Sequence, residues 1–462
     1  MRAQASILVS VLWCLALLSV VVIGVLHTAR LELLVGKNHG DRIQAHYLAL
    51  AGVEKAKALL YQEARDRSRS GKNHSGELYN APQQFRDISF GRGEFRVFRQ
   101  GRQDEGGGVI YGVSDEESRL SLNYASTNEL VKLYGMTPDV VAAILDWRDE
   151  DNVVTPGGAE VEYYSTLQPP YLPRNGPFQT IRELLMVRGV SRELLFGERG
   201  AKNQDGGDAA DSSPAEASDD VLNAGWSGIL TVDSSVQNVN AAGQARVDIQ
   251  SADEASLTSV KGITSAMAKA IINYRGQNRF DSLDNLLDVT AGQNQSAPQG
   301  NTSANGSDTS QTGQNQSAPP PQRRNAPNNS GANLISQDLL MDVADDLATV
   351  SDADLPGLVN INTASLEVLA CLPGITRELA QAIISYRQSS GFFPNVAWLL
   401  KVPGITRQIF KQVYPRVSVR SETFRILSEG KVSSTGARQR IMVIVHVGLH
   451  EIETLSYRED DL

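Results

Sequence analysis

The sequence predicts an α+β protein in which a long N-terminal helix packs on an antiparallel sheet, and a large all-α insertion interrupts that sheet. Three observations predict this fold class. An uncharged apolar run occupies residues 7–26, strand-like alternation occurs at 93–113 and again at 422–448, and a repeated helical pattern lies between the two strand regions. Because strands bracket the helical repeats, we expect both strand regions to form one sheet.

The N-terminal run has the length of a transmembrane helix. Its roughly 20 residues rise about 1.5 Å each, which matches a hydrocarbon core of about 30 Å. A secretory signal peptide is the alternative, but its apolar core usually has about 7–15 residues and ends at a small-residue cleavage site. Helical apolar spacing continues here through Leu31–Leu34 and Ile43–Leu60. We therefore expect one helix whose first half lies in lipid and whose second half is amphipathic.

Composition and motifs exclude several classes of function. Hydrophobic residues make up 41% and charged residues 21% of the 462 residues, as in globular chains of several domains. The net charge of −10 argues against a protein built mainly to bind nucleic acid. The two cysteines, Cys14 and Cys371, are too few for a structural zinc site. The sequence holds neither a phosphate-binding loop nor a Gly-x-Ser-x-Gly elbow, and it predicts no enzyme.

Alternating strand patterns flank the helical region. Residues 93–98 and 109–113 alternate and are separated by a polar loop that ends at Gly106–Gly108, which predicts a hairpin with a long loop. Residues 422–428 and 440–448 return to strand spacing after the last helical repeat.

Three copies of one helical pattern begin at Leu120, Val247 and Val359. Each copy contains a glycine followed by Met or Ile and then Thr, and later a helix that ends in Trp or Tyr and then Arg. Glycine takes a tight turn at no steric cost, and the Thr or Ser two residues later can cap the next helix. Copies one and three hold a second such turn. The pattern predicts tandem helix-hairpin-helix units with turns at Gly135, Gly189, Gly262, Gly374 and Gly404.

An acidic cluster in the first copy is the one group of residues with chemical promise. Asp146 and five further carboxylates crowd a segment that Pro156–Gly158 interrupts; the others are Asp149, Glu150, Asp151, Glu160 and Glu162. Calcium takes six to eight oxygen ligands, which a loop rich in carboxylates and carbonyls supplies. A solvated acidic loop is the alternative interpretation, and charge alone leaves both open.

Nucleic-acid binding is the main competing function, because helix-hairpin-helix units in many proteins bind the DNA backbone. The DNA-binding form usually has a second glycine where these copies have Thr. Residues 121–199 hold 7 basic and 11 acidic residues, and residues 246–290 hold 5 and 6. Residues 355–416 hold 6 basic and 2 acidic residues, a net of +4, and resemble the competence-type DNA receptor domain at 360–365 and 372–376. Only the third copy therefore supports a DNA-binding function.

Several passages along the whole chain carry a second resemblance. They lie at 7–19, 29–32, 115–123, 144–151, 158–164, 169–178 and 184–190. In sequence and order they resemble the minor pseudopilin K family of type II (general) secretion systems. The resemblance implies a pilin-like helix on a pilin-like sheet, with the helical hairpins inserted between its strands.

The resemblance also implies a function. Members of the family are structural subunits: they cap a periplasmic pseudopilus together with other minor pseudopilins and help to start its assembly. It implies a single-pass protein of the inner membrane, with most of the chain in the periplasm, that prepilin peptidase processes. Some members bind calcium in the first insertion, which implies Asp149, Glu150, Asp151, Glu160 and Glu162 as candidate ligands.

This sequence departs from the family pattern at two places. Pilin-type leaders normally end in glycine, whereas the alignment places Ala5 before the cleavage point and Ser6 first in the mature chain. Position five of the mature chain would then be Ser10, where pilin-like subunits usually carry glutamate. The second departure is an additional repeat and linker at about 223–356.

These patterns predict nine segments. They are a leader (1–5), the transmembrane and pilin-like helix (6–70), pilin-like strands (85–118), the first helix-hairpin-helix domain (119–200), an acidic linker (201–222), the second repeat (223–290), a disordered linker (291–333), the third repeat (334–417) and the closing strands (418–462).

Overall fold

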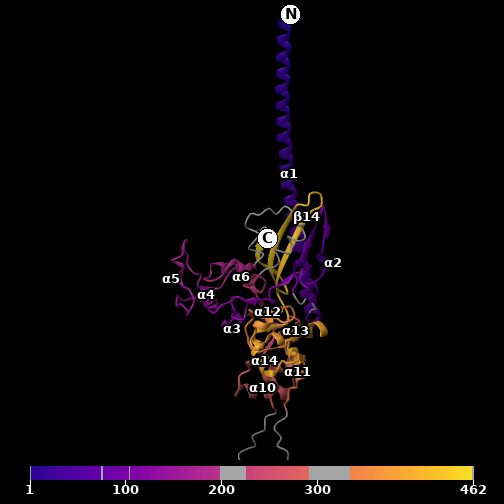
Figure 1. Ribbon diagram of the computed structural model, residues 1–462. Helices are drawn as coiled ribbons and strands as arrows, with labels where there is room; N and C mark the ends of the chain where they lie inside the picture. The colour runs from indigo at the N-terminus through magenta and orange to yellow at the C-terminus, as the bar shows by residue number, and fades with distance from the viewer. Residues whose placement is uncertain (1, 74–75, 103–104, 198–224, 291–332, 460–462) are drawn as a thin grey trace, which may run out of the picture. The chain divides into compact units, whose positions relative to one another are not determined.

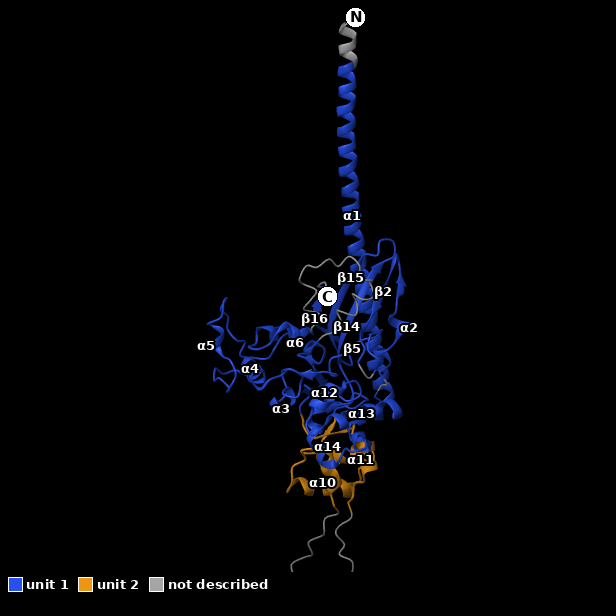
Figure 2. Ribbon diagram, in the orientation of Figure 1, with its two compact units in different colours: residues 1–245, 352–462 blue, residues 246–351 orange. Residues whose placement is uncertain are grey.

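The computed structural model describes residues 2–73, 76–102, 105–197, 225–290 and 333–459. The chain divides into two compact units, shown in blue and orange in Figure 2. Unit 1 comprises residues 1–245 and 352–462, and unit 2 comprises residues 246–351. Both predicted linkers, 201–222 and 291–333, lie outside the described residues except for Asn333.

Helix α1 (Arg2–Ser70) begins unit 1 and is the long indigo helix in Figure 1. Its apolar N-terminal part is exposed and is long and apolar enough to cross a membrane, features that a signal sequence near the N-terminus would share. Further along, one face is buried by small and apolar residues three to four positions apart: Ala45, Ala49, Val53, Ala56, Leu60 and Ala64. The predicted helix with an amphipathic second half is therefore confirmed.

Two glycines allow α1 to approach strand β14 (Thr423–Val432) closely. A Cβ atom on Gly430 would lie 2.1 Å from the carbonyl oxygen of Ala45, and one on Gly52 would lie 2.2 Å from Ser428 Oγ. Both distances are well inside van der Waals contact, so a larger residue at either position would push the helix off the sheet.

The main sheet has the strand order β1–β2–β14–β15–β16, and every neighbouring pair is antiparallel. Its remaining bounds are β1 (Ile88–Phe90), β2 (Gly93–Val97), β15 (Arg438–Val447) and β16 (Ile452–Arg458). The short strand β5 (Ser114–Asp115) also pairs with β14. Because β2 pairs with β14, strands from both sides of the helical insertion share one sheet, which confirms the predicted α+β fold class.

The hairpin predicted at 93–113 takes a different form. Strand β3 (Arg99–Gln100) pairs with β4 (Val109–Ile110) in a separate ribbon, whereas β2 pairs with β1 and β14. The contacts of Arg99 hold β3 in this separate ribbon, away from the main sheet. Its guanidinium makes two hydrogen bonds to Glu105 at 2.7 and 2.8 Å, and its Nε donates to the carbonyl of Tyr79 at 2.9 Å. Tyr79 ends the 3₁₀ helix η1 (Glu77–Tyr79), which is followed by α2 (Pro82–Phe85).

Each helical copy opens and closes with a pair of parallel two-residue strands. The pairs are β6 (Leu120–Ser121) with β7 (Leu230–Thr231), β9 (Val247–Asp248) with β10 (Leu347–Ala348), and β12 (Val359–Asn360) with β13 (Val417–Ser418). A further antiparallel pair, β8 (Ser235–Gln237) and β11 (Asp354–Pro356), lies in unit 1 beside the two points where the chain leaves and re-enters that unit.

Short helices fill each copy. The first contains α3 (Thr127–Leu130), α4 (Pro138–Arg148), α5 (Val161–Tyr164), η3 (Ile181–Met186), α6 (Arg192–Phe196) and η4 (Trp226–Gly228). The second contains α9 (Glu254–Ser259), α10 (Ser265–Arg275), η5 (Leu283–Asp288) and α11 (Gln337–Val343). The third contains α12 (Leu366–Cys371), α13 (Arg377–Ser390), η6 (Val396–Lys401), α14 (Arg407–Val413) and η7 (Tyr414–Arg416). The first and third copies share one hydrophobic core in unit 1.

The five predicted turn glycines all adopt a left-handed backbone. Their φ values are +74° (Gly135), +84° (Gly189), +106° (Gly262), +72° (Gly374) and +90° (Gly404). In each turn the Thr or Ser two residues later accepts a hydrogen bond from a backbone N–H of the next helix; these residues are Thr137, Ser191, Thr264, Thr376 and Thr406. Glycine is needed because a side chain is strained at these φ values, and the cap satisfies one of the helix's free donors.

Residues 334–351 lie in the compact unit of the second copy, whereas the predicted boundary placed them with the third. Ser336 caps α11 by accepting from the N–H of Leu339 at 3.2 Å, as Thr406 caps α14. The Leu339 side chain lies 2.9 Å from where a Cβ on Gly262 would be. In sequence, the polar segment 291–333 therefore interrupts the second copy. Residues 246–290 and 334–351 belong to one compact unit, but their separation in the sequence made this difficult to predict.

Three consecutive carboxylates join the sheet to the helical copies of unit 1. Asp115 ends β5, Glu116 and Glu117 follow it, and the three are 3%, 0% and 0% exposed. Asp115 accepts hydrogen bonds from Asn360 and Thr363 of the third copy. Glu116 pairs with Arg119, with Arg425 of β14 and with the hydroxyl of Thr231. Glu117 accepts from the backbone N–H groups of Ser235 and Thr423.

One arginine in each copy ties its second helix to the segment that follows the opening strand. The Nη1 atom of Arg387 donates to the carbonyls of Ile361 at 3.0 Å and Ala364 at 2.8 Å. Arg148 makes the equivalent pair of bonds to Leu122 and Ala125, and Arg275 to Ile249 and Ala252.

We expect Arg387→Ala to destabilise unit 1 by about 2–4 kcal/mol, because it leaves two carbonyls without a charged donor and removes a buried side chain. Chemical denaturation followed by circular dichroism measures the change. Arg377→Ala is the matched control, since Arg377 is an exposed arginine of the same helix, and it should change stability by about 0.5 kcal/mol or less. Equal effects of the two substitutions would contradict a stabilising role for the Arg387 hydrogen bonds.

Candidate metal centre

Three carboxylates of the first copy converge on one point. Asp146 lies in the last turn of α4, Asp149 follows the end of that helix, and Glu160 precedes α5. One oxygen atom from each lies within 4.8 Å of the others. Asp146 and Asp149 are three residues apart, so the end of α4 places both on one side. The loop 149–160 then turns back and brings Glu160 to the same side.

The loop that closes the site is an insertion into the repeat. In the second copy 5 positions separate Arg275 from Phe280, and in the third copy 6 separate Arg387 from Phe393. In the first copy the equivalent residues are Arg148 and Phe178, 30 positions apart. The acidic residues after Arg148 thus occupy a segment that the other two copies lack.

Two of the carboxylates are buried, Asp149 is half-buried, and the group is short of hydrogen-bond donors. Asp146 is 0% and Glu160 2% exposed. Asp146 accepts from the backbone N–H of Thr155 at 3.1 and 3.2 Å, but both oxygens of Glu160 and Oδ1 of Asp149 are buried without a hydrogen-bond partner among the described residues. Gly158 makes room for them, because a Cβ there would lie 2.0 Å from Asp146 Oδ2.

Burial and mutual repulsion raise the pKa of two of these groups. Burial, followed by the charges of Asp146, Asp149 and Asp151, raises the pKa of Glu160 to about 7. Burial, followed by the charges of Asp151 and Asp146, also raises the pKa of Asp149. Three carboxylates this close need a proton or a cation between them.

Aromatic residues wall one side of the site. The ring of Trp147 lies 5.3 Å from that of Tyr164 and 6.3 Å from that of Phe178. Arg188 lies over the ring of Tyr163 at 5.1 Å and donates to the carbonyl of Gly158 at 2.9 Å. These contacts hold the returning part of the loop in place next to the carboxylates.

The structure brings together only part of the predicted ligand set. Asp149 and Glu160 meet, whereas Glu150, Asp151 and Glu162 are exposed. Asp151 instead accepts from the backbone N–H of Val153 at 2.7 Å. Asp146 completes the site although it was outside the predicted set. The spacing of three residues between Asp146 and Asp149 at the end of a predicted helix is the signal that could have found it.

These residues fit a hard divalent cation. All three are carboxylates, Glu160 and Asp149 offer oxygen atoms without hydrogen-bond partners, and calcium prefers carboxylate oxygens. A bound cation would neutralise the repulsion among the three groups. Asp146, Asp149 and Glu160 would hold it and thereby fix loop 149–160 against α4. The predicted cleavage residues Ala5 and Ser6 lie in α1, and their side chains are outside the description.

The fold and the site together define an α+β protein with a long apolar N-terminal helix, inserted helical hairpins and an acidic insertion. Residues 113–196, which include the acidic site, match the family model of type II secretion system protein K. Residues 243–291 and 357–418 match the helix-hairpin-helix motif. The first helical copy is thus similar to type II secretion system protein K, and the second and third copies are similar to the helix-hairpin-helix motif.

Individual relatives match parts of the chain. Type II secretion system protein K of Pectobacterium carotovorum is 25% identical over 199 residues, 42% of this chain and 60% of that protein. The protein K of Klebsiella pneumoniae is 30% identical over 167 residues, 33% of this chain and 48% of that protein. ComE operon protein 1 of Bacillus subtilis is 39% identical over 70 residues, 15% of this chain and 34% of that protein. The chain thus spans less than two thirds of each of these relatives.

A solved structure aligns with most of the chain. The crystal structure of the GspK–GspI–GspJ complex from the type 2 secretion system of enterotoxigenic Escherichia coli contains a chain that aligns with 92% of this chain and 99% of its own length. The sequence identity is 12% and the TM-score is 0.44, a value that does not establish a common fold.

We expect Glu160→Gln to weaken cation binding at least tenfold, because the amide removes one of three negative charges from a buried site. Luminescence of Tb³⁺ sensitised by Trp147, with competition by Ca²⁺, measures the affinity. Glu162→Gln changes charge to the same extent two residues away but at an exposed position, and it should change affinity less than twofold. A larger effect at Glu162 than at Glu160 would contradict the assignment.

We also expect the site to depend on pH. The pKa of Glu160 without an ion is about 7, above its ordinary 4.5, so the folded state retains a proton that the unfolded state releases. Stability without an ion should fall as pH rises from about 4.5 to about 7. Ca²⁺ must displace that proton, so its affinity should be lower at pH 6 than at pH 7.5. Calorimetric titration in buffers of different ionisation enthalpy measures the released proton, and release of none at pH 6 would contradict this.

Proposed function

We propose that this protein is a minor pseudopilin at the tip of the type II secretion pseudopilus, where it supports pseudopilus assembly and protein export. The observation that carries the proposal is the match of residues 113–196 to protein K. In this proposal α1 anchors the chain by a single pass in the inner membrane and most of the chain lies in the periplasm. Its partners are other minor pseudopilins, and prepilin peptidase processes its N-terminus.

The N-terminal run supports a position at the tip. A carboxylate at position five of a pilin-like subunit is buried in lipid, which is costly unless it meets a partner. Its usual partner is the free amine of the subunit already in the filament. A first subunit has no predecessor, and residues 7–26 hold no carboxylate. A plain membrane anchor shares this feature, and co-purification with other minor pseudopilins separates the two.

The acidic site supports a structural role for calcium. Loop 149–160 lies in the segment that matches protein K and depends on three mutually repelling carboxylates. We propose that Ca²⁺ fixes this loop. In this proposal the hairpins serve as packing units between proteins.

The central experiment is co-purification. Tagged full-length protein, extracted from membranes of a strain with an intact secretion system, should co-purify with the neighbouring minor pseudopilins, and deletion of its gene should stop export. Co-purification without an export defect would contradict the assembly role. Export that fails while no pseudopilin co-purifies would contradict the position at the tip.

Nucleic-acid binding by the third copy is the second candidate function. It is favoured by the net charge of +4 over residues 355–416 and by the match of 357–418 to the helix-hairpin-helix motif. A gel-shift titration of the full-length protein with duplex DNA at two salt concentrations separates the two functions. Micromolar binding that weakens steeply with salt supports a membrane-tethered receptor, and absence of binding supports the pseudopilin.

We expect Ser10→Glu to leave export intact or to impair membrane insertion, and not to improve assembly, because a tip subunit has no preceding amine to pair with the new carboxylate. An export assay with the chromosomal variant measures the effect. Ser10→Ala is the control and should behave as the native chain. Mass spectrometry of the membrane-purified protein should find Ser6 as first residue; an intact Met1 with normal export would contradict both the cleavage site and this argument.

A further inference from the structure

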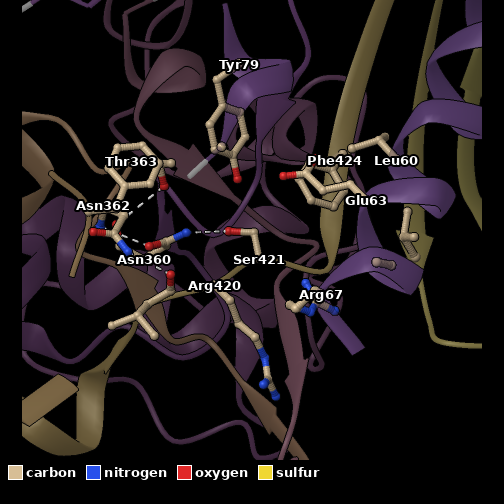
Figure 3. Close-up of a pocket in the computed structure, with 15 residues that line it drawn as sticks. Leu60, Glu63, Arg67, Tyr79, Asn360, Asn362, Thr363, Arg420, Ser421 and Phe424 are labelled. Carbon is tan, nitrogen blue, oxygen red and sulfur yellow. Dashed lines mark hydrogen bonds between the residues drawn. The ribbon is translucent and has the colours of Figure 1, made fainter. Parts of the chain in front are cut away.

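A polar pocket of unit 1 lies between the second half of α1 and the start of the third helical copy (Figure 3). Six separate stretches of chain meet there. Among the polar side chains that line it are Glu63 and Arg67 of α1, Tyr79 of η1, Asn360 of β12, and Arg420 and Ser421 between β13 and β14. The pocket therefore marks the contact between the anchoring helix and the hairpin domain.

Both arginines of the pocket, Arg67 and Arg420, form ion pairs with Glu422. Glu422 is 3% exposed, and its Oε1 lies 3.9 Å from Arg67 Nη2 and 3.6 Å from Arg420 Nε. Arg420 also donates from Nη2 to the carbonyl of Gln237 at 2.6 Å. The carboxyl of Glu63, by contrast, is half-buried and takes part in no hydrogen bond or ion pair with any residue that the structure describes.

Further acidic groups face Glu63 from the neighbouring elements. Glu77 and Tyr79 face it from η1, and Asp115 lies beyond Asn360 and Ser421 of the lining. Burial raises the pKa of Glu63 to about 7; Arg67 lowers it and Glu77 raises it to a smaller extent. Burial also raises the pKa of Asp115 and of Glu117 next to it, so this side of the pocket favours neutral carboxyl groups.

We propose that Glu63 makes the contact between α1 and the third hairpin copy sensitive to pH: the closed pocket holds Glu63 as a neutral acid, and ionisation opens the contact. The closed state binds a proton that an open, hydrated Glu63 releases at about its ordinary value of 4.5. The contact therefore loses stability as pH rises from about 4.5 to about 7. Between pH 6 and pH 8 its opening equilibrium constant should rise about tenfold.

Hydrogen exchange of the full-length protein in detergent micelles at pH 6 and pH 8 tests the proposal, with rates corrected for the intrinsic dependence on pH. Peptides that cover 60–67, 358–364 and 419–424 should lose about tenfold in protection at pH 8 in the native chain. Glu63→Gln, which is neutral at both pH values, should keep the same protection at both. Unchanged protection in the native chain would overturn the proposal, and so would a tenfold loss that persists in Glu63→Gln.

Two matched variants identify the titrating group. Glu54→Gln removes the same charge from an exposed position of the same helix, where Glu54 pairs with Lys57 at 2.9 Å, and the tenfold change should persist in it. His446→Gln tests the imidazole whose Nδ1 lies 3.4 Å from the Thr423 hydroxyl. The tenfold change should persist there too, and its loss in His446→Gln would overturn the assignment to Glu63.

Discussion

Unit 1 depends on the burial of three consecutive carboxylates between the sheet and the helical copies. Each meets a different partner, because the chain turns directly after Asp115 and the three side chains leave the backbone in different directions. Arg119 and Arg425 outweigh the effect of burial and lower the pKa of Glu116, whereas burial raises the pKa of Asp115 and Glu117. The junction thus combines one ionised group paired with arginines and two groups that favour the neutral form. Its geometry fixes where the helical copies leave the sheet.

The sequence predicted the elements whose periodicity extends over many residues. Helix α1 and the repeated hairpins follow from apolar spacing and from the glycine and threonine of each turn. The two-residue strands that close each copy could not be predicted, because two residues show no period. The role of Asp115–Glu117 was equally hidden, since acidic residues are ordinarily exposed and only the tertiary fold supplies Arg425 and Asn360 as partners.

The candidate site was predicted in its location and charge but not in its membership. Acidic density alone could not separate Asp146 and Glu160, which are buried, from Glu150 and Glu162, which are exposed. Burial at this point depends on the path of loop 149–160, and Gly158 and the ties of Arg188 decide that path. A run of carboxylates in one sequence segment therefore predicts a site more reliably than it predicts its ligands.

The three copies differ in the loops that connect their helices, whereas their hairpins are alike. All three keep the arginine tie, the left-handed glycine and the parallel closing strands. The first copy adds the acidic loop after Arg148, the second carries residues 291–333 within its fold, and the third has neither addition. An insertion is tolerated where the chain on both sides is fixed independently, as Arg148 fixes the end of α4. The third copy, which lacks insertions, is also the copy that contacts Asp115 and lines the pocket beside α1. The third copy must therefore keep the shape that contacts the sheet. The acidic loop of the first copy does not have this requirement and can hold a ligand instead.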